Sequence, residues 1–407
     1  MNDQRLGPAI CSRAVTSHAT RAVQHRRRPF VAPLVPRSPN EEHRASTPLE
    51  LLFDLVVVVA VAQAASGLHH ALAEGHAGHG VLRYSMAFFG VWWAWMNFTW
   101  FASAYDNDDV AYRLLVLLQL TGALVYAAGI PRFERGDLTV GVTGYVVMRL
   151  ALVTLWLRAA NADPPRRRSA RRFALGVFVV QVAWVAKLFG PAWLELPGFW
   201  ILAGCELLVP LWAERAAPTT WHAEHISERY GLFTLITLGE SILAASVAVR
   251  TASEAGASTA SLLSIIVGGL LIVFSFWWLY FERPAHEMLT SMRAAFLWGY
   301  GHYFVFASAA AVGAGLAVAV DHATHHADIS RVAAGAAVSV PVAVYLLCLW
   351  FLHGRSEPTA VAPLVVSGVL AMPFTGHAVL GTGLLMAGLT AFKVVRAGRA
   401  PHPSDSA

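Results

Sequence analysis

Apolar residues dominate the chain in long stretches, which short polar segments separate. A stretch of about twenty residues allows an α-helix to cross the hydrocarbon core of a bilayer, which is roughly 30 Å thick. About twelve stretches satisfy this rule, so we predict an all-α, polytopic helical membrane protein. The last two stretches are short and are interrupted by Pro363 and Pro373. The expected helices cover residues 50–72, 82–104, 110–130, 138–160, 171–190, 196–214, 228–249, 260–282, 293–320, 331–353, 359–374 and 377–397.

The seventh expected helix carries an ionisable residue near its middle. Glu240 lies about 18 Å further along the helix axis than Glu228. An ionisable group near the bilayer midplane is costly to bury and is by default a candidate for a functional site. We predict that one stripe of this helix faces other helices or a watery cavity rather than lipid; its members are Arg229, Phe233, Ile236 and Glu240.

Two segments of the chain resemble each other and suggest an internal repeat. The first expected helix begins LELLFDLVVVVAVAQ at Leu49, and the seventh begins SERYGLFTLITLGES at Ser227. Each has a Glu at its start and a second acid deeper in the helix, and a Trp-rich helix follows each. Six helices separate the two copies, so both have the same orientation. We predict two six-helix halves, residues 46–214 and 215–398, related by a parallel repeat.

Composition and charge agree with a membrane location. Of the 407 residues, 56% are hydrophobic and 14% are charged, whereas about 25% are charged in soluble proteins. Arg-rich segments occur before the first helix, between the fourth and fifth, and after the last, which by the positive-inside rule predicts cytoplasmic N and C termini. Residues 1–45 are rich in Arg and Pro and are expected to form a disordered cytoplasmic tail. Residues 399–407 are expected to form a second disordered tail.

Glu50 and Asp54 lie one turn apart on the same face of the first expected helix. Two interpretations remain open for them. Acids in a first turn can complement the helix dipole and stay in contact with water. Alternatively, they form a cation or proton site at the cytoplasmic mouth.

Three more ionisable side chains are expected near the same depth in the membrane as Glu240: Arg149, Glu206 and His302. Arg149 can pair with one of the two glutamates and leave the other free to titrate, as proton carriers in pumps and exchangers do. A buried Arg–Glu pair can also serve helix packing alone. The sequence does not say which glutamate forms the pair.

Other chemistries find little support. The three cysteines have neither disulfide nor zinc spacing, and the histidines of two predicted outside loops fix no metal geometry. Phosphate-binding, dinucleotide-binding and hydrolase motifs are absent from the sequence. The net charge of +5 comes from residues at the ends of apolar stretches, so we expect no nucleic-acid partner. We predict neither a cofactor nor a metal, and a protein that is not an enzyme.

Two motifs resemble a known family. The segments ELLFDLVVVVAVAQ from Glu50 and HISERYGLFTLITLGESILA from His225 are similar to the signature stretches of the bacterial low-temperature-requirement protein A family. The similarity extends over residues 46–395. It implies a multi-pass protein of the bacterial inner membrane, and it gives no substrate. The motif residues that correspond here are Glu50, Asp54, Glu228, Arg229 and Glu240.

These observations favour a secondary transporter or an ion- or proton-coupled permease, embedded in the lipid bilayer, whose minimum cargo is a proton or cation. The two halves would enclose a polar site lined by Asp54, Arg149, Glu206, Glu240 and His302, with Glu240 as the coupling acid. A second hypothesis is a membrane-embedded enzyme that acts on lipid headgroups through its surface carboxylates, with the histidines His222 and His225. A third is a structural or regulatory membrane protein whose ion pairs serve only packing.

Overall fold

The computed structural model describes residues 29–39, 41, 44–133, 135–254, 256, 258–353 and 361–397, which form α-helices and short 3-10 helices without any strand. The predicted all-α fold is therefore confirmed. The first six α-helices are α1 Pro48–Ala73, α2 Ala77–Tyr105, α3 Val110–Phe133, α4 Thr139–Ala162, α5 Arg167–Lys187 and α6 Glu195–Glu214. The other six are α7 Ala223–Glu254, α8 Thr259–Phe281, α9 Met292–Ala323, α10 Arg331–His353, α11 Val361–Ala371 and α12 Ala378–Ala397.

Ten of these helices are long and apolar enough to cross a membrane. The other two are α2 and α11. The 29 residues of α2 would span a bilayer, but tryptophan, tyrosine and small polar residues lower its hydropathy, and neighbouring helices bury most of its side chains. With its 3-10 extension Met372–Phe374, α11 forms an apolar segment well short of the about twenty residues that a span needs. The protein is a multi-pass helical membrane protein.

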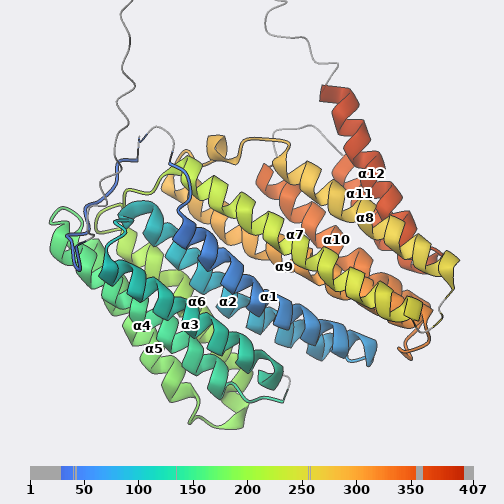
Figure 1. Cartoon of the computed structure of the whole chain (residues 1–407), viewed down its shortest axis with the longest axis horizontal. Coiled ribbons are helices and arrows are strands. Elements are labelled where there is room, and N and C mark those ends of the chain that lie inside the picture. The colour runs from blue at the N-terminus through green and yellow to red at the C-terminus, as the bar shows by residue number, and fades with distance from the viewer. Residues whose placement is uncertain are drawn as a thin grey trace, which may run out of the picture.

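Figure 1 shows α1 in the middle of the molecule, with α3 to α6 on one side and α7 to α12 on the other. The order of neighbours is similar in the two groups. In the first, α1 packs against α2 and α3, α3 against α4, and α4 against α5; in the second, α7 packs against α8 and α9, α9 against α10, and α10 against α11. A parallel repeat would produce this arrangement, and the duplication itself stays a prediction.

The helix α9 lies under both α1 and α7 and is the most enclosed of the candidate spans. Glycines allow its close approach to its neighbours. A Cβ atom on Gly315 would lie 2.2 Å from the carbonyl oxygen of Ala337 in α10, and one on Gly313 would lie 2.8 Å from Cα of Ser241 in α7. Small residues permit such backbone contacts between membrane helices. These contacts fix α7, and the polar residues on it, against the centre of the molecule.

The described residues before α1 (29–39, 41 and 44–47, the N-terminal segment) pack against the helices. Leu34 is 1% exposed. The guanidinium group of Arg44 donates to two main-chain carbonyls in the last turn of α2, at 2.5 and 2.7 Å. Arg37 lies 3.4 Å from Asp106. The disordered tail predicted through residue 45 is thus wrong for this part, because Leu34 is buried and Arg44 satisfies carbonyls at the end of α2. Residues 1–28 and 399–407 lie outside the described residues.

Asp106, at the end of α2, provides a pH-dependent test of this packing. Burial, followed by the nearby charge of Glu50, raises the pKa of Asp106 to about 6. The folded protein therefore binds a proton more readily than the unfolded chain, and this group's stabilising contribution is complete below pH 4 and is lost as pH rises through 6. We expect Asp106→Asn to increase the free energy of unfolding by roughly 1–3 kcal/mol at pH 8 and to change it little at pH 4. The measurement is the midpoint of thermal unfolding in detergent, which should rise relative to wild type at pH 8 only.

The matched control is Asp108→Asn, because Asp108 is exposed and pairs with Arg113 at the surface. That variant should change stability little at either pH. An Asp106→Asn effect of the same size at pH 4 and pH 8 would contradict the assignment.

Candidate functional site

Two acids on α1 face two basic side chains on α7. The Nε2 atom of His225 lies 3.0 Å from Oε1 of Glu50, and Nη2 of Arg229 donates to Oδ1 of Asp54 at 2.7 Å. The two acids are four positions apart on α1, and the two basic residues are four positions apart on α7. Because α1 and α7 run in the same direction, the two contacts lie one helical turn apart. All four side chains are at most 1% exposed. We call this arrangement the α1–α7 ladder.

Local sequence explains how Glu50 is aimed. Thr47 is the N-cap of α1, and Pro48 follows at the first helical position, where its lack of an N–H costs nothing. The backbone N–H and the hydroxyl of Thr47 both donate to Oε2 of Glu50, at 2.8 and 2.9 Å, in a capping box. The other carboxylate oxygen of Glu50 is thereby directed to His225. The helix start thus both stabilises α1 and orients one acid of the ladder.

A second buried ion pair joins α4 to α6. Arg149 donates to Glu206 at 2.7 Å, and the two side chains are 1% and 0% exposed. Trp93, Tyr145 and Gln181 also donate to the carboxylate, at 3.0, 3.1 and 2.8 Å. Four donors satisfy both oxygens of Glu206. This cluster, the α4–α6 pair, has the features of a site that fixes helix packing.

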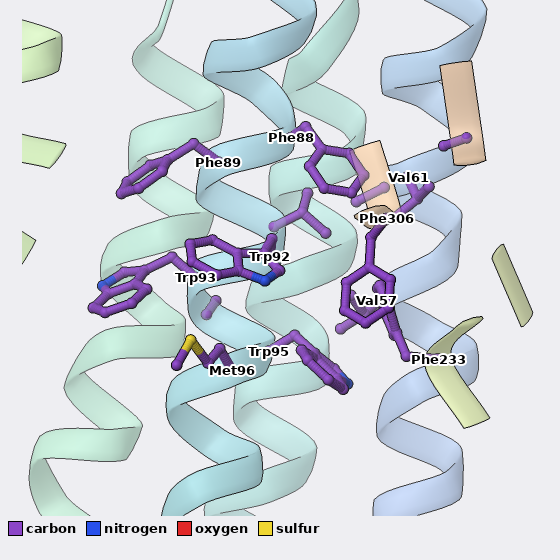
Figure 2. Packing of buried hydrophobic residues seen from close by; sticks show 14 of the residues in the cluster. Val57, Val61, Phe88, Phe89, Trp92, Trp93, Trp95, Met96, Phe233 and Phe306 are labelled. Atoms are coloured by element: carbon purple, nitrogen blue, oxygen red, sulfur yellow. The ribbon is translucent and has the colours of Figure 1, made fainter. Parts of the chain in front are cut away.

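The helix α2 connects the two ion pairs through its tryptophans. Trp93 donates to Glu206, and Trp95, two residues later, donates to Asp54 at 2.6 Å. Residues two apart on a helix lie on nearly opposite faces, and Figure 2 shows these indoles pointing to opposite sides of α2. The Trp-rich pattern of this helix therefore supplies a hydrogen-bond donor to each buried acid.

The ladder differs from the α4–α6 pair in its unsatisfied carboxylate oxygen. Oδ2 of Asp54 is buried and has no hydrogen-bond partner among the described residues, and the same holds for Nε and Nη1 of Arg229. Oε1 of Glu50 and both ring nitrogens of His225 also lack an aligned hydrogen bond, although Oε1 and Nε2 are 3.0 Å apart. A buried polar atom without a partner costs about 1–3 kcal/mol. Such a group in a native structure calls for an explanation, and binding of an ion or a proton is one. Arg149 also has two nitrogens without a hydrogen-bond partner, but both carboxylate oxygens of Glu206 have partners.

Glu240 lies beyond an aromatic layer on the same helix. Phe233 packs against Trp95 and Phe306, with ring centroids 4.4 and 4.9 Å apart. Figure 2 shows these three rings together beside α1. Glu240 is roughly 16 Å further along α7 than Arg229. It is half-buried, and no hydrogen bond or ion pair joins it to another described residue.

The predicted stripe on α7 is only partly buried. Arg229 and Phe233 are enclosed, as expected, whereas Ile236 and Glu240 are half-buried. Beyond Phe233 the buried face of α7 continues along α9, where Ser241 donates to the carbonyl of Ala309 at 2.9 Å. The packing against α9 therefore leaves Glu240 at the edge of the contact.

The remaining candidates lie elsewhere. His302 is buried, with Nδ1 2.7 Å from the carbonyl of Trp298 and Nε2 3.1 Å from the hydroxyl of Tyr280, in an aromatic cluster without an acid. Glu228 is exposed and accepts from the N–H of Ser46 at 3.4 Å. The residues of the expected single polar site thus lie in four separate places: the ladder, the α4–α6 pair, the isolated Glu240 and the aromatic cluster around His302. Within the described residues, no three His, Cys, Asp or Glu side chains form a group that could hold a metal ion.

Sequence reasoning missed the donors that surround the buried acids. The sequence predicts Trp93 and Trp95 only as members of a Trp-rich helix, and no pattern in it distinguishes Tyr145 or Gln181. His225 was considered as an acid–base group at the surface, whereas it is buried against Glu50. The matching spacing of two acids on α1 and two basic residues on α7 was the available signal.

Comparison with known proteins agrees with the sequence motifs. Residues 45–397 match the family described as bacterial low temperature requirement A protein (LtrA). The chain belongs to this family. A relative from Rhizobium meliloti (strain 1021), described as an uncharacterized protein, is 26% identical over 295 residues. That alignment covers 64% of this chain and 66% of the relative, just under two thirds of its length. No solved structure matches the chain.

The LtrA match includes every residue of the ladder and of the α4–α6 pair. It begins at residue 45, so most of the N-terminal segment lies before it. This segment nevertheless reaches the start of α7, where Nε2 of His222 is 2.9 Å from the carbonyl oxygen of Glu41. In this LtrA protein, residues outside the family match therefore cover the end of the bundle nearest the ladder.

The α4–α6 pair gives a test of packing. We expect Arg149→Met to destabilise the protein by about 3–5 kcal/mol, because Glu206 would remain buried without a compensating charge. Arg149→Met combined with Glu206→Gln should recover part of that loss, since no charge then remains buried and the amide oxygen can still accept from the donors around it. Thermal unfolding in detergent, followed by tryptophan fluorescence, measures both effects. A double variant as unstable as the single one would contradict the assignment.

Proposed function

We propose that this LtrA protein is a secondary transporter or permease that moves a proton or small cation across the bacterial inner membrane. The path would run along the interface of α1 and α7. The ladder would form its first polar stage, and Glu240 would be the acid that the cargo reaches next.

The observation that carries this proposal is the ladder itself. Asp54 and Arg229 are buried where α1, from the first group of helices, meets α7, from the second. Oδ2 of Asp54 has no hydrogen-bond partner among the described residues. Ionisable groups inside a membrane protein typically mark an ion or proton pathway. Transporters with two repeated halves bind their cargo at the boundary between the halves.

The aromatic layer gives the path a closed position. Phe233, Trp95 and Phe306 lie between the ladder and Glu240 on the same side of α7. Apolar constrictions exclude water and so block ion movement. Movement of α7 relative to α1 would break the ladder contacts and part these rings. Protonation of Asp54 or binding of a cation would weaken its pair with Arg229 and favour that movement.

The charge distribution supports an orientation. Among the described residues, three basic segments are Arg37 and Arg44 before α1, the six arginines from Arg158 to Arg172 around the α4–α5 turn, and Lys393 and Arg396 in α12. All three lie at the end of the bundle where α1 begins. By the positive-inside rule this end, with the ladder near it, faces the cytoplasm.

The geometry gives less support to the alternatives. A headgroup-modifying enzyme needs its acid–base groups within reach of lipid, whereas Glu50 and His225 are 1% and 0% exposed. A purely structural role suits the α4–α6 pair, in which the carboxylate is fully satisfied. It does not account for Glu240, a half-buried acid in the middle of a long apolar helix.

The decisive experiment measures proton and potassium flux in liposomes that contain the purified protein. We expect Glu240→Gln to reduce flux at least tenfold, because the amide is nearly isosteric and cannot carry a proton or an equivalent charge. The control is Glu224→Gln, which removes an exposed acid in the first turn of the same helix. That variant should retain the wild-type rate.

Both variants must first show the unfolding temperature of the wild type. Equal flux for Glu240→Gln and the wild type would contradict the role of Glu240. Absence of flux of either ion in the wild type would contradict the proposed cargo.

A further inference from the structure

A cleft lies at the opposite end of the bundle from the ladder. It has a volume of about 460 Å³, within the range of small-molecule sites. Its walls come from the last turns of α7 and from the middle of α8, and Leu316 of α9 lies at its base. Gly269 of α8 allows Leu316 to pack closely against this wall, since a Cβ atom on it would lie 3.1 Å from Cδ1 of Leu316. Apolar residues such as Ile242, Val249 and Ile265 line most of the surface.

The rim of the cleft carries one charge of each sign. Arg250 and Glu254 lie one turn apart at the end of α7, with Nε and Oε1 4.0 Å apart and side chains 71% and 72% exposed. The helix has 32 residues, so it is about 48 Å long and exceeds the roughly 30 Å hydrocarbon core. Its last turns therefore reach the headgroup region, while Ile242 lies about 12 Å deeper.

We propose that this cleft binds one phosphatidylethanolamine molecule, with an acyl chain between α7 and α8 and the headgroup on Arg250 and Glu254. The phosphate would accept from the guanidinium group, which matches phosphate oxygens geometrically. The primary ammonium group would donate to the carboxylate. The proposal is independent of the transport function, since none of these residues belongs to the ladder.

The headgroup, rather than the acyl chain, must determine which lipid the cleft prefers. Lipid tails are as apolar as leucine, so placing an acyl chain in the cleft gains little relative to the surrounding bilayer. Discrimination between lipids must come from the rim. Phosphatidylglycerol offers no cation to Glu254, and the quaternary ammonium group of phosphatidylcholine has no N–H to donate. A headgroup with a phosphate and a primary ammonium group satisfies both side chains, and the additional carboxylate of phosphatidylserine would be repelled by Glu254.

The test is lipid retention. The full chain is reconstituted in bilayers with equal amounts of phosphatidylethanolamine, phosphatidylglycerol and phosphatidylcholine of identical acyl chains. It is then extracted in mild detergent, and native mass spectrometry counts the lipids that remain bound. We expect one phosphatidylethanolamine per chain in the wild type. Arg250→Gln should lower its retention about tenfold, as the loss of a hydrogen bond to a charged group predicts.

The matched control is Arg132→Gln. Arg132 forms a similar exposed pair with Asp137, 3.5 Å apart, at the same end of the bundle, and neither residue lines the cleft. This variant should retain the wild-type lipid. A second variant, Ala245→Phe, fills the cleft and should abolish retention while Arg250 remains.

Three results would overturn the proposal. The first is equal retention of the three lipids or preference for phosphatidylglycerol in the wild type. The second is equal loss of lipid in Arg250→Gln and Arg132→Gln. The third is full retention in an Ala245→Phe variant that unfolds at the wild-type temperature.

Discussion

The structure depends on pairing two deeply buried carboxylates, Asp54 and Glu206, each with an arginine and with an indole N–H from α2. An unpaired ion inside a low-dielectric interior costs several kcal/mol, and water is scarce at this depth to satisfy it. Asp54 and Glu206 meet this constraint in the same way, with Arg229 and Trp95 in one case and Arg149 and Trp93 in the other. Their positions on opposite faces of α2 determine where α1, α4, α6 and α7 can lie. The helix α2 is therefore rich in aromatic residues rather than strongly apolar.

The two ion pairs satisfy this constraint to different degrees. Four donors from α2, α4 and α5 surround Glu206, so moving α6 would break four hydrogen bonds together and moving α4 would break two. Asp54 keeps an oxygen without a partner among the described residues, whereas both oxygens of Glu206 accept hydrogen bonds. A rigid pair within the first group of helices and an incompletely satisfied pair between the two groups would allow the groups to move relative to each other. This contrast links the packing of the bundle to the proposed transport.

Helix length and side-chain chemistry also fix the ends of the protein. The 32-residue α7 extends beyond the hydrocarbon core, so its ionisable terminal turns can interact with headgroups. At the other end, Arg44 donates to the last carbonyls of α2, and Thr47 caps α1 beside the ladder. The N-terminal segment thus completes helix ends that would otherwise be exposed near buried charges.

The sequence by itself determined the membrane class, the all-α fold, most of the helix positions and the family, because hydrophobic length is a local property and the two motifs are contiguous. It also identified Asp54, Arg149, Glu206, Arg229 and Glu240 as residues that need an explanation. Only the tertiary structure decided their partners. Arg149 selects Glu206, and Arg229, 175 residues away in the sequence, reaches Asp54. Helical periodicity gives the direction of a side chain on its own helix but not the neighbour it meets. Crossing angles between helices decide that, and for the same reason the stripe on α7 is buried at Phe233 and half-buried at Glu240.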